Sequence, residues 1–173
     1  MELKKVVGLP EIVVSRPPDQ VAFLVEDIEE SMRGWSAARE GDWRLYLYDQ
    51  ELIKEPTYRG RPGDFSMRLA LLGSGPQIEL IQPLDGPSIY HDWIAEHGYG
   101  FHHLGYFVPS LDEAVQLFAK AGLEPIQTGR GYGLDGDGGF AYFDTIDQLG
   151  MTLEVIEVPQ RRRPSLPVPN DCA

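Results

Sequence analysis

The order of apolar and polar residues predicts the same short unit twice along the chain. Residues 20–26 alternate as in a half-buried strand, and apolar residues then recur at helical spacing up to residue 35. Residues 103–118 repeat this succession of strand, turn and amphipathic helix. Asp27 and Ser110 precede the two helices, where a short side-chain oxygen can accept hydrogen bonds from free backbone amides. The chain therefore contains a duplicated module.

Ligand-capable residues occupy equivalent places in the two copies. Laid in register, the first strands place Gln20 on His103. The later apolar strands IELI and LEVI place Glu79 on Glu154 in the same way. Two polar residues at the same positions in each copy bring four side chains close to a pseudo-twofold axis. This arrangement suits a metal ion.

Each copy has the element order βαβββ, so we expect an α+β fold. Two tandem modules would form a cup-shaped, partly closed mixed β-sheet with helices outside. A parallel βαβ fold is disfavoured because there are too few helices for the strands. Residues 1–17 are expected to be a leader with a short strand at Glu11–Val14. The other predicted segments are a first module, a connecting helix, a second module and a Pro-rich tail, at residues 18–84, 85–100, 101–158 and 159–173.

Composition narrows the function classes. The chain of 173 residues has a formal net charge of −12 and a pI near 4.6, which disfavours nucleic-acid binding. It has no apolar run of 18 residues, so no membrane span is expected, and no signal peptide is recognised. Cys172 is the only cysteine, which indicates a reducing cytoplasm. The single basic cluster, residues 161–163, is interpreted as a solvated chain end.

The four equivalent residues offer one imidazole and three oxygen donors. This set suits one octahedral divalent ion per chain: Zn, Ni, Co, Mn, Mg or Fe. Two carboxylates neutralise a dication, and open coordination positions remain for substrate. A glutamate on an apolar strand often points simply to water, but its recurrence in both copies favours the metal site. An ion here would stabilise an enolate, and a nearby carboxylate would move the proton.

The remaining histidines and the Gly-rich segment have structural interpretations. His102 is expected on the face of the strand opposite to His103, and His91 and His97 on the solvent side of the connecting helix. Residues 130–139 lack a following helix, so we interpret them as a flap or a hairpin loop rather than a phosphate cradle. Some of the aromatic residues are expected to line the cup and about half to lie on the helix side: Tyr46, Tyr48, Phe65, Tyr106, Phe107 and Tyr142.

The chain resembles the vicinal-oxygen-chelate superfamily over residues 20–158, in the repeated segments QVAFLVEDIEESM, IELIQP, HHLGYFVPSLDEAV and TLEVIE. Its members include glyoxalase I, methylmalonyl-CoA epimerase, extradiol dioxygenases and antibiotic resistance proteins. The resemblance implies metal ligands at Gln20, Glu79, His103 and Glu154, a series that eukaryotic glyoxalase I shares. It also implies Glu154 as the first candidate for the catalytic base, with Glu79 as its symmetric partner. The epimerase has a further glutamate on the strand that matches residues 65–73, where this chain has no carboxylate.

These observations predict a metal-dependent lyase or isomerase that acts through a metal-stabilised enolate. The expected substrate is an acyl thioester or a bulky carbonyl compound. An extradiol dioxygenase is disfavoured because it needs two histidines. The alternative is a protein of the same fold that binds or sequesters a small molecule without chemistry. We also expect a homodimer, because the sheet edges would otherwise be unpaired.

Overall fold

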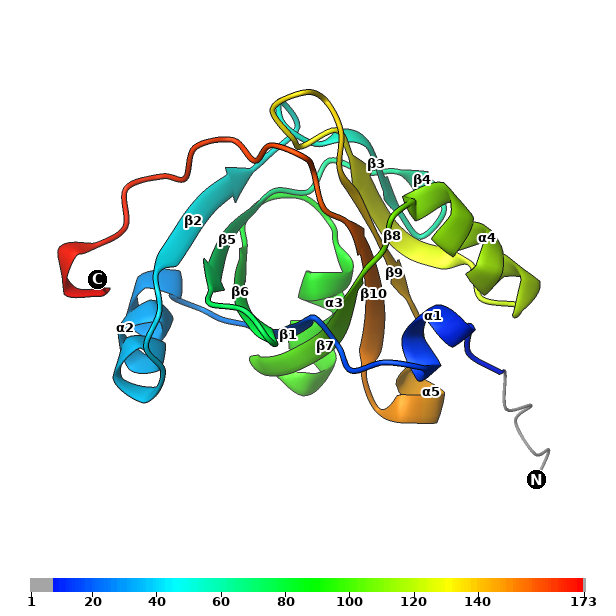
Figure 1. The fold of residues 1–173 in the computed structure, drawn as a ribbon, viewed down its shortest axis with the longest axis horizontal. Helices are drawn as coiled ribbons and strands as arrows, with labels where there is room; N and C mark the ends of the chain where they lie inside the picture. The colour runs from blue at the N-terminus through cyan, green and yellow to red at the C-terminus, as the bar shows by residue number, and fades with distance from the viewer. Residues whose placement is uncertain (1–7, 173) are drawn as a thin grey trace.

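One ten-stranded β-sheet curls into a cup in the computed structural model, which describes residues 8–172 (Figure 1). The first half of the chain supplies β1 (Gln20–Leu24), α2 (Ile28–Ala38), β2 (Trp43–Tyr48), β5 (Met67–Leu72) and β6 (Gln77–Pro83). The second half supplies β7 (Gly100–Phe107), α4 (Leu111–Lys120), β8 (Pro125–Arg130), β9 (Gly139–Phe143) and β10 (Thr152–Glu157). The connecting helix is α3 (Ile89–His97).

The strand order shows the duplication directly. The sheet runs β2-β5-β6-β1-β7-β10-β9-β8, so each half contributes four strands in mirrored order. The first strand of each half is parallel to the last, and β1 meets β7 in antiparallel pairing at the centre. In that pairing Gln20 faces Gly105 and Ala22 faces His103, as a twofold axis between the strands requires. The predicted fold class is confirmed, whereas the exact module boundaries stay a prediction.

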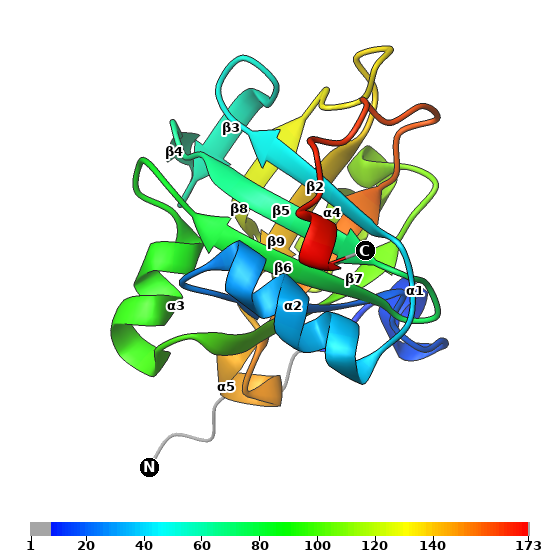
Figure 2. The same ribbon diagram turned by 90° about the vertical axis from the view of Figure 1, so that its left-hand side faces the viewer.

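The two main helices cover the outer face of the sheet. Asp27 accepts hydrogen bonds from the amides of Glu29 and Glu30, and Ser110 accepts one from the amide of Glu113. Figure 2 shows α2 across the outside of β5 and β6, and α4 contacts β9 and β10 in the equivalent place. The caps fix where each helix begins, and the helical spacing of apolar residues puts the apolar side of each helix against the sheet.

Three hydrophobic clusters hold the layers together. Ile28 and Met32 pack with strand residues under α2, and Leu111 and Phe118 do so under α4. A third cluster fills the inner side of the cup and is rich in aromatic side chains: Tyr46, Tyr48, Phe65, Tyr90, Tyr132, Phe140 and Tyr142. Burial on both faces explains why the central strands are almost continuously apolar.

Segments from elsewhere in the chain contact both edges of the eight-stranded core. A hairpin inserted between β2 and β5 forms β3 (Lys54–Tyr58) and β4 (Arg61–Pro62), and β3 pairs with the far edge at β8. The opposite edge, β2, forms a bridge between Leu45 and Leu166 of the tail. The β8 edge of the core is therefore paired, whereas β2 is still the end strand of the sheet and has this single bridge on its outer side. The homodimer stays a prediction.

The structure corrects the expected strand at Glu11–Val14. This segment is the helix α1, in which the carbonyl of Pro10 accepts from the amides of Val13 and Val14. A strand would need a partner, whereas a helix satisfies its own backbone, and Val13 packs into the cluster under α4. Residues 1–7 of the expected leader lie outside the described residues. Two short helices, α5 (Ile146–Leu149) and the 3₁₀ turn η1 (Asn170–Cys172), were not expected. No helix within residues 8–172 has the length and apolarity needed to cross a membrane.

Candidate metal centre

Three of the four predicted ligands converge at the centre of the cup. Glu79 comes from β6, His103 from β7 and Glu154 from β10. The Nε2 atom of His103 lies 3.2 Å from Oε2 of Glu79 and 2.9 Å from Oε2 of Glu154. One donor atom from each residue lies within 4.8 Å of the others. The side chains are 0–6% exposed, so bulk water does not solvate their charges.

Gln20 joins the same cavity from β1. Its Nε2 donates a hydrogen bond to Oε1 of Gln77 at 3.0 Å, which leaves its own Oε1 without a partner. Gly105 gives this side chain room, because a Cβ at that position would stand 2.9 Å from the Gln20 oxygen. The cavity is lined by Gln20, Glu79 and Glu154 together. The amide oxygen is thus free to serve as a fourth donor.

The pattern of unsatisfied atoms fits a divalent ion. The atoms without a hydrogen-bond partner include Gln20 Oε1, Glu79 Oε2, His103 Nε2 and Glu154 Oε2. The imidazole nitrogen lies at ion-pair distance from both carboxylates, yet none of these atoms has a hydrogen-bond partner. Native proteins leave few buried polar atoms unsatisfied, and four in one cavity need an explanation. One nitrogen and three oxygens that carry two negative charges would satisfy a dication.

The electrostatics of the cluster show what holds the carboxylates together when no ion is bound. Burial lowers the pKa of His103, but the carboxylates of Glu154 and Glu79 outweigh it and raise the pKa to about 9. Burial also raises the pKa of Glu79, with a further contribution from the charge of Glu154. At neutral pH a proton on the imidazole therefore takes the place that a cation would take.

His102 differs from the prediction that strand alternation gave. The register of β7 against β1 shifts between Ala22 and Phe23, so His102 is the extra residue of a bulge. Its ring is buried against Trp93 and Tyr90 of α3, and its Nδ1 lies 2.9 Å from Nδ1 of His103. Burial lowers the pKa of His102 well below its ordinary value, so the ring is neutral and accepts the Nδ1 proton of His103. That hydrogen bond turns Nε2 of His103 toward the two carboxylates.

Aromatic side chains enclose the cluster. The ring of Tyr142 lies 5.0 Å from that of His103, and its hydroxyl accepts a hydrogen bond from Tyr90 at 3.0 Å. Tyr48, Tyr132 and Phe140 complete the wall. Of the aromatic residues singled out from the sequence, Tyr48 and Tyr142 line the cavity, whereas Tyr106 lies in the cluster under α4. The free space is only about 20 Å³, close to the room of one water molecule.

Arg162 is the residue of this site that sequence reasoning missed. The tail crosses the mouth of the cup and places the partly buried Arg162 in the wall of the cavity (Figure 1). Its Nη1 donates to the hydroxyl of Tyr48 at 3.1 Å. The interpretation of residues 161–163 as a solvated end is therefore wrong for Arg162, although Arg161 and Arg163 are exposed. No local pattern in the Pro-rich tail distinguishes the three arginines.

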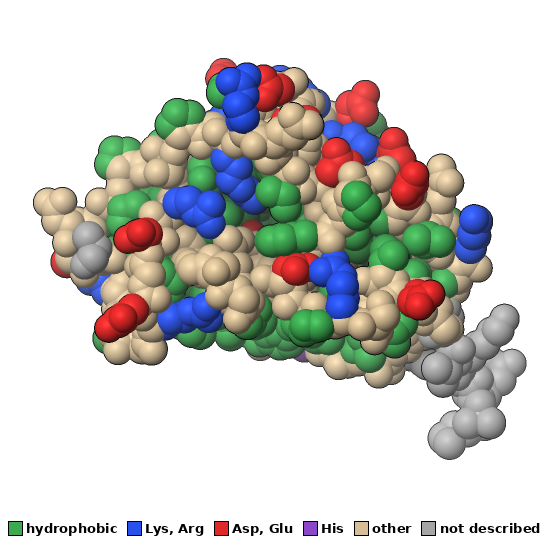
Figure 3. Space-filling view, in the orientation of Figure 1, with side chains coloured by type: hydrophobic (Ala, Val, Ile, Leu, Met, Phe, Trp, Pro, Cys, Tyr) green, Lys and Arg blue, Asp and Glu red, His purple; other side chains and the backbone are tan. Residues whose placement is uncertain are grey.

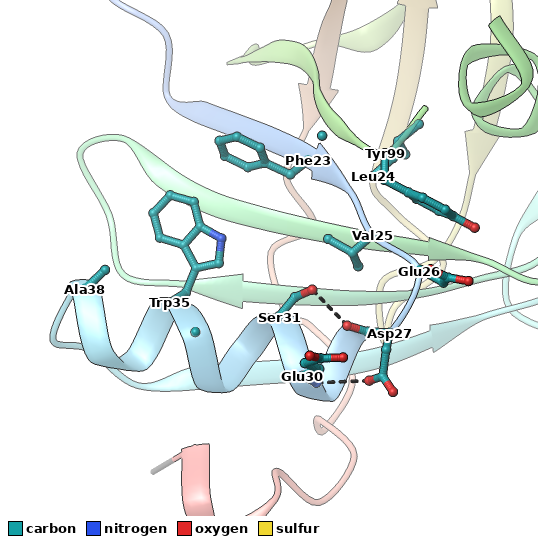
Figure 4. Close-up of a pocket in the computed structure, with 12 residues that line it drawn as sticks. Phe23, Leu24, Val25, Glu26, Asp27, Glu30, Ser31, Trp35, Ala38 and Tyr99 are labelled. Carbon is teal, nitrogen blue, oxygen red and sulfur yellow. Dashed lines mark hydrogen bonds between the residues drawn. The ribbon is translucent and has the colours of Figure 1, made fainter. Parts of the chain in front are cut away.

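The other segments considered from the sequence lie outside the cluster. His91 and His97 are exposed on α3, as expected. Residues 131–138 connect the antiparallel strands β8 and β9, which agrees with a hairpin loop. A large hollow, about 920 Å³, is an open groove between α2 and β1 with Phe23, Trp35 and Tyr99 on its walls (Figure 4). It contains no histidine and none of the predicted ligands, so it is not the chemical centre.

Comparisons with known proteins agree with this fold. The sequence model of the Glyoxalase/Bleomycin resistance protein/Dioxygenase superfamily matches residues 19–143. No curated protein matches the sequence significantly.

Solved structures of similar fold include a hypothetical protein from Bacillus halodurans (21% identity, 85% of this chain and 97% of that chain, TM-score 0.56). Methylmalonyl-CoA epimerase from Mycobacterium tuberculosis is similar at 20% identity (82% and 87%, TM-score 0.58). A variant of the Streptomyces coelicolor epimerase in complex with 2-nitronate-propionyl-CoA is similar at 16% identity (85% and 97%, TM-score 0.59). At these identities the likeness concerns the fold.

Proposed function

Because the chain belongs to the Glyoxalase/Bleomycin resistance protein/Dioxygenase superfamily, we propose that it is a metal-dependent lyase or isomerase. Its substrate is a carbonyl compound or an acyl thioester, and the reaction removes a proton from the carbon next to the carbonyl. The observation that carries this proposal is the buried cluster of Glu79, His103 and Glu154. The epimerases with a similar fold support the same reaction class.

Each residue of the cavity has a separate role in the proposed reaction. A divalent ion held by Gln20, Glu79, His103 and Glu154 would polarise the carbonyl and stabilise the enolate. Glu154 is the first candidate for the base that takes the proton, and Glu79 stands opposite as the group that can return one. His102 holds the imidazole of His103 in the orientation that the site requires. The aromatic wall excludes water from the carbanion.

Strand β5 offers no further acid or base to the cup. Its only charged residue is Arg68, and the guanidinium of Arg68 pairs with Glu29 of α2 on the helix side at 2.9 Å. The cavity side of the strand consists of Met67 and Leu69. A reaction that needs two proton carriers would therefore use Glu79 and Glu154, which are themselves candidate ligands.

The test combines metal content with isotope exchange. Protein purified without chelator or nickel resin should contain about one divalent ion per chain by elemental analysis. Candidate acyl thioesters and hydroxy ketones are then incubated in D₂O, and deuterium entering the carbon next to the carbonyl is followed. Glu154→Gln keeps an oxygen donor but cannot accept a proton. We expect exchange to fall about 10²–10⁴-fold, far more than metal occupancy.

The matched control is Glu113→Gln, which removes an exposed carboxylate on α4 and should leave both readouts unchanged. Equal exchange in wild type and Glu154→Gln would move the base to Glu79, where Glu79→Gln repeats the test. If the purified protein contains no metal and shows no thermal shift on adding Zn, Co, Ni or Mn, the proposal is wrong. Tight ligand binding without exchange would instead make the chain a sequestering protein.

A further inference from the structure

We propose that Arg162 forms a subsite for an anionic group of the substrate at the mouth of the cup. The inference rests on the proposed function and narrows its substrate to a carbonyl compound that carries a carboxylate or a phosphate. The carbonyl would reach the floor of the cavity, where Glu79 and Glu154 lie. The anionic group would meet the guanidinium in the wall of the same cavity.

The guanidinium of Arg162 has no direct ion-pair partner among the described residues. Its contacts are the hydroxyl of Tyr48 and the rings of Tyr46 and Tyr132, whose centroids lie 5.8 Å from the guanidinium carbon. Within residues 8–172 no carboxylate lies at ion-pair distance from it. Several other arginines do have such partners, as Arg59 has Asp92 and Arg68 has Glu29. Aromatic faces hold a cation in place without neutralising it.

The net charge of the cavity also favours an anionic substrate. Glu79 and Glu154 carry two negative charges, which a dication would balance. Arg162 then leaves one positive charge in the wall of the cavity. A guanidinium presents paired N–H donors that match a carboxylate or a phosphate, so a monoanionic substrate would complete the balance.

The tail must move for any substrate to enter, because the closed cavity has only about 20 Å³ of free space. The tail is fixed on one side to the loop between β8 and β9. There the amide of Leu134 donates to the carbonyl of Arg161 at 2.9 Å, and Arg161 pairs with Asp135. On the other side Leu166 bridges to β2. Figure 3 shows Lys and Arg side chains on the face that this segment crosses. Binding of the substrate anion to Arg162 would return the tail to its place across the mouth and so close the cup.

The experiment compares two probes of nearly equal shape, acetoacetate, which is anionic, and acetoacetamide, which is neutral. Calorimetry gives the affinity of each for metal-loaded protein. The ion itself can favour the anion, so the measured quantity is the ratio of the two affinities. Arg162→Gln should lower that ratio about tenfold to a hundredfold, because a hydrogen bond to a charged group is lost. Arg162→Lys keeps the positive charge but lacks the paired N–H donors of the guanidinium. Its affinity ratio should lie between those of wild type and Arg162→Gln.

The matched control is Arg163→Gln, which removes the neighbouring exposed arginine and should keep the wild-type ratio. Acetoacetate should also slow tryptic cleavage after Arg161 in the wild type, whereas acetoacetamide should not. An unchanged ratio in Arg162→Gln, or no measurable binding of acetoacetate to wild type, overturns the proposal. Metal content and deuterium entry into acetoacetamide above the uncatalysed rate report the proposed function separately. The two ideas can therefore fail independently.

Discussion

Metal binding should release a proton from His103, and the structure gives the size of the effect. The pKa of His103 is raised to about 9, since the carboxylates of Glu154 and Glu79 outweigh the effect of burial. At pH 7 the imidazole is then almost fully protonated. A ligand nitrogen must be deprotonated, so each bound ion has to displace about one proton. Two pH units correspond to about 2.7 kcal/mol, or about a hundredfold in affinity.

Calorimetric titration of Zn²⁺ or Ni²⁺ into metal-free protein measures this release. The observed enthalpy is plotted against the ionisation enthalpy of several buffers, and the slope counts the protons. We expect at least about one proton at pH 7, because the raised pKa of Glu79 acts in the same direction. The apparent affinity should rise about tenfold per pH unit between pH 6 and 8 and level off above about 9.

A control variant separates His103 from the other histidines. His91 is exposed on α3, and His91→Gln should give the wild-type slope. A slope near zero at pH 7 in wild type would refute the reasoning. In that case His103 would not be a ligand, or the carboxylate pair would not hold its proton.

Two further outcomes follow from the same site. Metal-free protein should lose stability as pH rises from about 6.5 through 9, by roughly 3 kcal/mol, because a raised histidine pKa stabilises the fold only while the proton is bound. Thermal melts from pH 6 to 10 test this, and a flat profile in chelator-treated protein would contradict it. Gly105→Ala should weaken metal binding and cost about 1–3 kcal/mol of folding free energy, because the new Cβ would stand 2.9 Å from Gln20 Oε1 and 3.0 Å from Ile156 Cδ1. Gly34→Ala, on α2 with no atom within 4 Å of the new Cβ, is its control, and equal metal affinity in the two variants would show that Gln20 has no part in the site.

The features that the sequence predicts well are those that repeat. Apolar periodicity identified the paired strands and helices, and the register of the two copies placed Glu79 opposite Glu154. The structure brings these two residues to His103 within ligand distances. Repetition supplies this information because equivalent positions in two modules must lie at symmetric places around a shared axis.

Features that depend on distant contacts could not be predicted. The hairpin of β3 and β4 exists because it pairs with β8 about 70 residues later in the chain, and local pattern carries no trace of that contact. The bulge at His102 depends on how β1 and β7 meet. Arg162 lies in a segment without periodicity, and its place is set by the loop and the edge strand that hold the tail.

The central pairing of β1 with β7 has a stereochemical consequence. Two identical half-length chains would have to place the same residue at both equivalent positions, either two glutamines or two histidines. Because both copies lie in one chain, Gln20 and His103 can differ while Glu79 and Glu154 stay alike. The two sides of the cup are therefore chemically distinct. A planar intermediate held between them would meet different side chains on its two faces, Gln20 on one side and His103 on the other, and this difference allows a proton to be delivered to one face in preference to the other.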